Sequence, residues 1–337
     1  MSYHSYILEI SLSNVFFTDR NVEGYMTIGQ AKDHWMLSQN SLSISIERRK
    51  ALNPDTDCFI PTRVKRIQNL FIILYGVFGE IPSIKNAVLY DLNKSTLQSV
   101  SLPDAFKVYE KYNCKPFLTF DDFAEISISD SRKIATTCIS YIMGSHASIN
   151  QNERFRFLWS AFNVLYRKAF QNLSPEWKRP KSLLIEMVKN NELNDEQVRV
   201  SNFNFDSTFW NFSHFLSGFS ALKHQKDKSI SSLAPKALSY ADEVMLEALL
   251  KSDNKRRNSY IENNNPLKES LASIEERETS NLIFLFGIYF YWLRCDSMHA
   301  EHRYEIFQSK DYLATASMVY DTFEKVVVKA LLHVVNS

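Results

Sequence analysis

The segment NERFRFLWSAFNVLYRKAF, residues 152–170, carries the pattern on which the predicted fold rests. Its large apolar residues recur at intervals of three and four positions, as a helix face requires: Phe155, Leu158, Trp159, Phe162 and Tyr166. Such a wide apolar face must pack against other helices. We therefore predict that this stripe belongs to a helical core and is not a platform for stacking bases.

Similar helical patterns continue through the rest of the chain. We predict helices over 129–144, 180–191, 207–225, 238–252, 280–295 and 311–335. The polar and charged segment 254–270 is predicted to be a loop. No internal repeat is present, so these segments predict one bundle of five or more helices.

The first third of the chain has a different pattern. Apolar and polar residues alternate over 5–12, 41–47, 86–92 and 97–102, as in half-buried strands, and 62–78 is periodic and long enough for a helix. We predict a small α+β domain of unknown role over residues 1–128 and a helical domain over residues 129–337. The predicted fold class is therefore mainly α.

Composition narrows the classes of function. The chain has 337 residues and 45% hydrophobic residues, with only 7 glycines but 24 phenylalanines. This mix favours helices packed through aromatic side chains over a glycine-rich dinucleotide-binding fold. A formal net charge of +1 excludes a strongly basic surface overall. A small active site could still act on RNA.

Cysteines and apolar runs bear on cofactors and location. The four cysteines, Cys58, Cys114, Cys138 and Cys295, are far apart and form no C-x-x-C pair. We expect reduced thiols and no metal or other cofactor. The apolar run 282–293 is shorter than the about 20 residues of a membrane span, and the N-terminus lacks the pattern of a signal peptide. These features predict a soluble, cytoplasmic protein.

An arginine and two histidines follow that apolar run, in the sequence YWLRCDSMHAEH, residues 291–302. Arg294 and His299 are five positions apart, about 140° away from a shared face on a continuous helix. They can meet at one site only if the helix ends between them. The polar sequence after Cys295 predicts an end near residues 296–298.

The chemistry of this pair suits cleavage of RNA without a metal ion. Histidine exchanges protons near neutral pH, and arginine binds phosphate oxygens through its fork of N–H groups. His299 would activate the 2′-hydroxyl or protonate the leaving oxygen, and Arg294 would stabilise charge on the phosphorus centre. Asp296 would orient either residue.

The segment YWLRCDSMHAE resembles the R-x(4–6)-H signature that HEPN-domain ribonucleases carry at the end of a hydrophobic helix. The segment ERFRFLWSAFNVLY resembles an earlier helix of the same domains, and the two occur in the expected order before a long last helix. The resemblance covers about residues 129–337. Asp296 stands where asparagine is frequent, and Ala300 stands where glycine is frequent.

The resemblance implies a helical domain that forms a homodimer, with two R-x4-H motifs facing each other across a cleft that cuts RNA. Arg294 and His299 match the motif directly. His302 and Asn163 are candidate supporting residues. Proteins of this family serve as toxins of toxin–antitoxin pairs, as anti-phage defence effectors and in RNA processing, which implies an antitoxin or a phage-derived trigger as a partner.

Two alternatives stay open on the sequence alone. The helical domain could be a non-catalytic HEPN-like module that binds a nucleotide or a partner protein through Arg294 and His299. The chain could also be an adaptor whose N-terminal domain recognises a trigger. We favour the endoribonuclease because both members of the R-x4-H pair are present.

Overall fold

The computed structural model describes residues 3–13, 20–106, 114–174, 176, 178–201, 282–291, 294 and 310–337. The chain divides into two compact units, residues 1–147 with 335–337 and residues 148–334. The predicted boundary at residue 128 falls between the third and fourth helices of the first unit.

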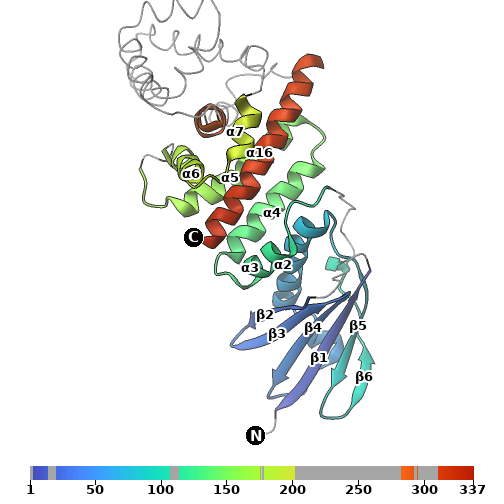
Figure 1. Ribbon diagram of the computed structural model, residues 1–337. Coiled ribbons are helices and arrows are strands. Elements are labelled where there is room, and N and C mark those ends of the chain that lie inside the picture. Colours follow the sequence, from blue (N-terminus) through green and yellow to red (C-terminus); the bar gives the residue numbers. More distant parts are fainter. Residues whose placement is uncertain are drawn as a thin grey trace, which may run out of the picture. The chain divides into compact units, whose positions relative to one another are not determined.

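A six-stranded antiparallel sheet forms one layer of the first unit (Figure 1). Its strand order is β2-β3-β4-β1-β5-β6. Buried and more exposed residues alternate along most strands, so one face of the sheet is buried and the other is open. The strands are β1 (His4–Leu12), β2 (Val22–Ile28), β3 (Ala31–Ser38), β4 (Ser41–Arg48), β5 (Ile84–Asp91) and β6 (Thr96–Ser99).

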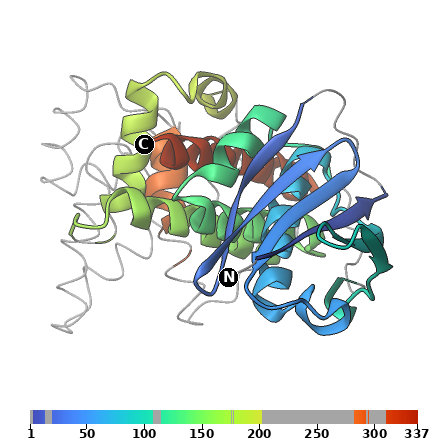
Figure 2. The same cartoon turned by 90° about the horizontal axis from the view of Figure 1, so that it is seen from below.

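The first unit also contains helices, and Figure 2 shows them from another side. They are α1 (Pro54–Asp57), α2 (Pro61–Phe78), the short 3-10 helix η1 (Asp104–Phe106), α3 (Phe120–Ile128) and α4 (Arg132–Ala147). A proline opens α2 and Gly79, with φ of 74°, ends it. Thr119 and Asp122 form a reciprocal capping box at the start of α3. Local sequence therefore sets the ends of these helices.

The prediction of a mainly α chain is wrong, because the first unit is built on this six-stranded sheet. The sequence patterns found β1, β4, β5 and β6 but not β2 and β3. On β2, Gly24 takes a buried position against Trp35, where a side chain would clash. On β3, the charged Asp33 takes a buried position. Both residues hide the alternation that marks a strand.

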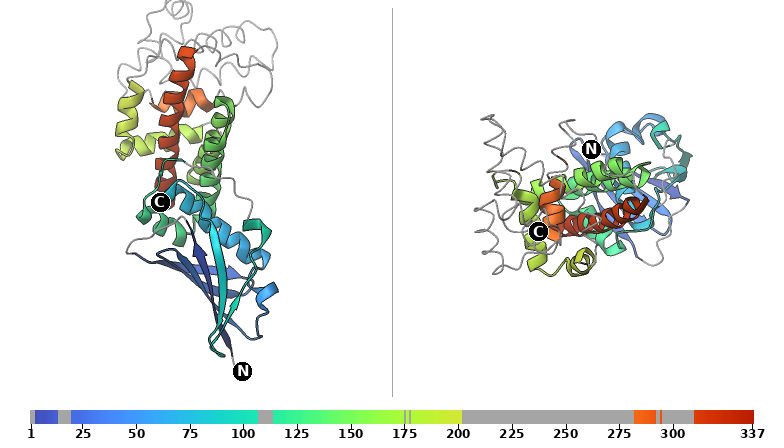
Figure 3. Two further views of the ribbon diagram at one scale, coloured as in Figure 1. Left: turned by 90° about the vertical axis from the view of Figure 1, so that its right-hand side faces the viewer. Right: turned by 90° about the horizontal axis from the view of Figure 1, so that it is seen from above.

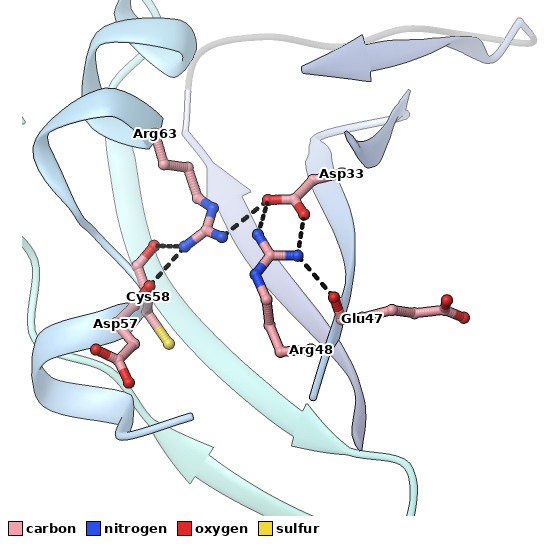
Figure 4. A network of polar contacts seen from close by, with 6 residues as sticks. All are labelled: Asp33, Glu47, Arg48, Asp57, Cys58 and Arg63. Atoms are coloured by element: carbon pink, nitrogen blue, oxygen red, sulfur yellow. Dashed lines mark hydrogen bonds and ion pairs between the residues drawn. The ribbon is translucent and has the colours of Figure 1, made fainter. Parts of the chain in front are cut away.

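Asp33 is tolerated in the core because two arginines pair with it (Figure 4). Arg48 from β4 approaches it at 2.7 Å and Arg63 from α2 at 2.8 Å. Arg63 also donates to the main-chain carbonyls of Asp57 and Cys58, each at 2.6 Å. The network therefore joins β3, β4, α2 and the turn after α1 around one buried carboxylate.

The second unit is helical in the part that the structure describes. It contains α5 (Gln151–Ala169), α6 (Lys178–Lys189), α7 (Asn194–Ser201), the π-helix η2 (Ile283–Tyr289) and most of α16 (Lys310–Asn336). Figure 3 shows η2, in orange, beside the red α16. The ring of Phe323 on α16 packs against Phe286 and Phe290 at centroid distances of 5.0 and 4.8 Å.

The helices predicted over 129–144, 152–170, 180–191 and 311–335 are confirmed as α4, α5, α6 and α16, with small shifts of their ends. The helices predicted over 207–225 and 238–252, and the loop predicted over 254–270, lie outside the described residues. None of the described helices is both long and apolar enough to cross a membrane.

Candidate functional site

Helix α5 supplies one wall of the candidate site. Its first turn is capped by Asn150, whose side chain accepts from the main-chain N–H of Glu153 at 2.9 Å. Arg154 ties the helix to α16 through ion pairs with Asp321 at 2.7 Å and Glu324 at 3.0 Å. These contacts fix the position of α5 along α16.

The predicted apolar stripe of α5 is confirmed as core. Phe155, Leu158, Trp159, Phe162 and Tyr166 are all buried. Phe155 meets Phe290 edge to face at 5.2 Å, and Trp159 meets Tyr291 at 6.1 Å. Helix α5, which contains the resembling segment 153–166, therefore packs against Phe290 and Tyr291. Tyr291 is the first residue of the second resembling segment, 291–301, in which only Tyr291 and Arg294 are among the described residues.

The helix that leads to Arg294 is not a regular α-helix. Residues 283–289 form a π-helix, which has more residues per turn than an α-helix and occurs often at functional sites. Gly287 allows close packing here, since a side chain on it would lie 3.2 Å from both Leu184 and the Lys181 main chain of α6. A π-helical turn shifts the positions of Phe290, Tyr291 and Arg294 around the helix axis relative to those predicted by α-helical spacing.

Arg294 is helical, partly buried and close enough to Tyr166 to act on its hydroxyl. Burial raises the pKa of Tyr166 far above its usual range, and the negative charge of Glu176 raises it further. The positive charge of Arg294 opposes both effects and lowers that pKa. Because burial is the largest effect, the phenol stays protonated, and the charge of Arg294 acts against this shift.

Three buried polar atoms on the same side of α5 have no hydrogen-bond partner within the part of the chain that the structure describes. They are Nε1 of Trp159, Oδ1 of Asn163 and the hydroxyl of Tyr166, and all three are buried. Their spacing of four and three residues places them along one face of the helix. Buried polar atoms in folded proteins are nearly always paired, so a row of three unpaired atoms marks an unusual place in this core.

The predicted site residues divide into two groups. Arg294 and Asn163 are described, and both belong to the second unit. Asn163 is three residues before Tyr166 on α5. Asp296, His299 and His302, together with the predicted end of the helix at 296–298, lie outside the described residues. The meeting of Arg294 with His299 therefore stays a prediction.

Tyr166 is the neighbour of Arg294 that the sequence analysis missed. Its spacing places it in the core stripe, and its ring does lie in the core, 5.6 Å from Phe162 and 6.0 Å from Trp159. Its hydroxyl is the distinguishing feature, because phenylalanine would fill the same space. A tyrosine at a position that periodicity assigns to the core is the signal that could have pointed to it.

No group of three or more histidine, cysteine, aspartate or glutamate side chains within the described part of the chain is arranged to hold a metal ion. No protein-family model, curated protein or solved structure matches this chain.

Proposed function

We propose that this chain is an endoribonuclease that cuts RNA without a metal ion, with Arg294 and His299 as its catalytic residues. The observation that carries the proposal is the packing of α5 against the helix that bears Arg294. Trp159, in the first segment that resembles HEPN ribonucleases, contacts Tyr291, the first residue of the second segment, although the two residues are more than 100 positions apart in the sequence.

The surroundings of Arg294 also support the proposal. The residue is partly buried, and its charge acts on the hydroxyl of Tyr166, whose ring lies in the aromatic core. A guanidinium held against packed helices has fewer orientations than one on a free surface, and a low local dielectric strengthens its attraction for phosphate. Both properties suit stabilisation of a transition state.

The proposed reaction is an internal transfer at phosphorus. His299 removes the proton of the 2′-hydroxyl, and the oxygen attacks the adjacent phosphorus atom. The bond from phosphorus to the 5′-oxygen breaks, and that oxygen receives a proton. Arg294 stabilises the charge on the non-bridging oxygens, and Asp296 orients the pair. The products are a 2′,3′-cyclic phosphate and a 5′-hydroxyl.

The proposal includes the setting in which the enzyme acts. We place it in the cytoplasm as a homodimer through its helical domains, serving as a toxin or as an anti-phage defence effector. An antitoxin or a phage-derived trigger would then control it, and His302 and Asn163 would support the catalytic pair. The resemblance to HEPN ribonucleases is the support for this setting.

The test is cleavage of total RNA by the purified protein, with and without EDTA. Arg294→Ala and His299→Ala should each lower the rate about 10²–10⁴-fold, since the two roles differ. Asp296→Asn should have a milder effect, because asparagine still offers a polar group. Analysis of the product ends should show cyclic phosphate.

Arg156→Ala is a matched control, because Arg156 is an exposed arginine on α5. It removes the same charge and should cut RNA at the wild-type rate. Wild-type cleavage by His299→Ala would refute the catalytic assignment. Activity that disappears in EDTA and returns with a divalent metal would refute the metal-independent mechanism. Binding of RNA or nucleotides without cleavage would support the non-catalytic module instead.

A further inference from the structure

The hydroxyl of Tyr166 has no evident structural use. The side chain is fully buried, and its hydroxyl has no hydrogen-bond partner among the described residues. An unpaired buried hydroxyl destabilises a fold, whereas phenylalanine would keep the ring contacts with Trp159 and Phe162 without that cost. A tyrosine in this position therefore needs another explanation.

Asn163 carries a hydrogen-bond acceptor that suits the Tyr166 hydroxyl. Its Oδ1 atom is also buried, has no partner among the residues the structure describes, and lies three residues earlier on the same helix. Side chains at this spacing are neighbours on a helix surface. The amide oxygen can only accept a hydrogen bond, and the phenol has one proton to donate. The two unpaired atoms are therefore chemically complementary.

Arg294 belongs to a helix that packs against the same face of α5 as Asn163 and Tyr166. Tyr291, one helical turn before it, packs its ring against Trp159 of α5 at 6.1 Å. This contact holds the helix that bears Arg294 against the face of α5 that carries Asn163 and Tyr166. Arginine has five N–H donors and no acceptor, while the phenol oxygen can accept as well as donate. A guanidinium therefore has enough donors to bond the Tyr166 oxygen and a phosphate oxygen at the same time.

We propose that Arg294, Tyr166 and Asn163 form a hydrogen-bond relay that closes when RNA binds. Arg294 donates to the Tyr166 oxygen, and the Tyr166 hydroxyl donates to Oδ1 of Asn163. The relay fixes the plane of the guanidinium against the scissile phosphate. Tyr166 and Asn163 are thus positioning residues that act through Arg294, and the inference rests on the proposed function. Hydrogen bonds of active sites often tighten only in the substrate complex.

The first test is Tyr166→Phe, which removes only the hydroxyl. We expect the kcat for RNA cleavage to fall about 10- to 100-fold, the range expected for a lost hydrogen bond to a charged group. The thermal unfolding midpoint should stay the same or rise, since an unpaired buried hydroxyl is removed. Tyr25→Phe, which removes the hydroxyl of an exposed tyrosine in the first unit, is the control and should change neither quantity.

The second test changes the acceptor. Asn163→Asp keeps an oxygen at the relay position and should retain most of the activity, whereas Asn163→Leu should lose as much as Tyr166→Phe. The double variant with Tyr166→Phe and Asn163→Leu should lose no more than either single variant, because one relay is broken in each case. Independent, multiplying losses in the double variant would overturn the relay.

A third measurement does not depend on cleavage. Hydrogen exchange at Nε of Arg294, followed by NMR with a saturating short RNA oligonucleotide, should be slower in the wild-type protein than in Tyr166→Phe. Equal exchange rates would overturn the relay whether or not RNA is cut. Cleavage that survives in Arg294→Ala would refute the proposed function itself. Loss of cleavage in Arg294→Ala with a wild-type kcat in Tyr166→Phe would refute the relay alone.

Discussion

Asp33 shows how one residue can depend on the whole unit around it. Its side chain has no exposed surface, and its charge is balanced by Arg48 and Arg63. Arg63 is itself almost fully buried. A buried ion pair adds little stability compared with apolar residues of the same volume, but the loss of one partner leaves an uncompensated charge in the core.

We therefore predict that Asp33→Ala lowers the free energy of unfolding by about 3–5 kcal/mol, as measured by urea denaturation. Asp121→Ala is the matched control, because Asp121 pairs with Arg20 while both side chains are about 70% exposed. That change should cost less than about 1 kcal/mol. Equal losses of unfolding free energy in the two variants would contradict the prediction that burial makes the Asp33 ion pairs costlier to break than an exposed pair.

Cys58 gives a prediction about pH. Burial raises the pKa of its thiol to about 11, although the nearby charge of Arg63 opposes the shift. In the unfolded chain the thiol loses its proton near pH 9, while the folded chain still holds it. Because the folded chain keeps the proton that the unfolded chain loses, the free energy of unfolding is unaffected by this thiol below pH 9 and falls as the pH rises from 9 towards 11.

Cys58→Ala should reduce the fall in the free energy of unfolding between pH 9 and 11 by about 2–3 kcal/mol. Denaturant unfolding at several pH values measures this fall. Cys114→Ala, at a half-buried cysteine, is the control for loss of a thiol. A pH dependence that is identical in wild type and Cys58→Ala would contradict the prediction.

At the scale of elements, the end of α2 depends on a glycine. Gly79 has a φ of 74°, its N–H donates to the Tyr75 carbonyl at 2.8 Å, and its own carbonyl accepts from Cys114 at 2.8 Å. A side chain here would collide with the main-chain carbonyl of Cys114. Positive φ and close main-chain packing therefore act at the same residue.

Gly79→Ala should cost about 3 kcal/mol or more, because the backbone strain adds to a clash that only main-chain movement relieves. Gly29→Ala separates the two effects. Gly29 also has a positive φ, of 64°, but nothing lies within 4 Å of an added side chain. It should cost about 1–2 kcal/mol. Thermal or urea unfolding gives both values, and similar losses would mean that the clash at Gly79 relaxes freely.

At the scale of the whole molecule, the proposed function predicts a homodimer. One Arg–His pair supplies few donors and proton carriers, whereas two pairs across a two-fold axis supply more, and two-fold dimers are the commonest oligomers. Light scattering should give twice the chain mass at micromolar concentration. The cleavage rate should rise faster than linearly with protein concentration below the dimer dissociation constant.

A monomer in light scattering, both alone and with RNA, would count against this assembly. A cleavage rate strictly proportional to protein concentration over the same range would lead to the same conclusion. Arg156→Ala, which keeps both proposed catalytic residues, should match the wild type in both measurements. Arg294→Ala should keep the dimer mass while losing activity, which would separate assembly from catalysis.

The amino-acid sequence alone determined the elements whose periodicity is uninterrupted. The alternating segments became β1, β4, β5 and β6, and the helical segments became α2, α4, α5, α6 and α16. The helices and strands β1, β4 and β5 were predicted correctly because period 3.6 and period 2 follow directly from burial of one face. Strand β6 has no buried residue, so burial does not explain why its pattern was recognised. The sequence also singled out Arg294, since an arginine directly after a long apolar run is conspicuous.

Only the tertiary structure decided the remainder. A charged Asp33 can occupy a core position of β3 because Arg48 and Arg63 reach it from other elements, and Gly24 fits β2 because Trp35 fills the space beside it. The π-helix at 283–289 and the approach of Arg294 to Tyr166 likewise depend on packing between distant segments. Local propensity carries no information about partners about 10 to 130 residues away in the sequence, so these features became visible only when the chain was folded.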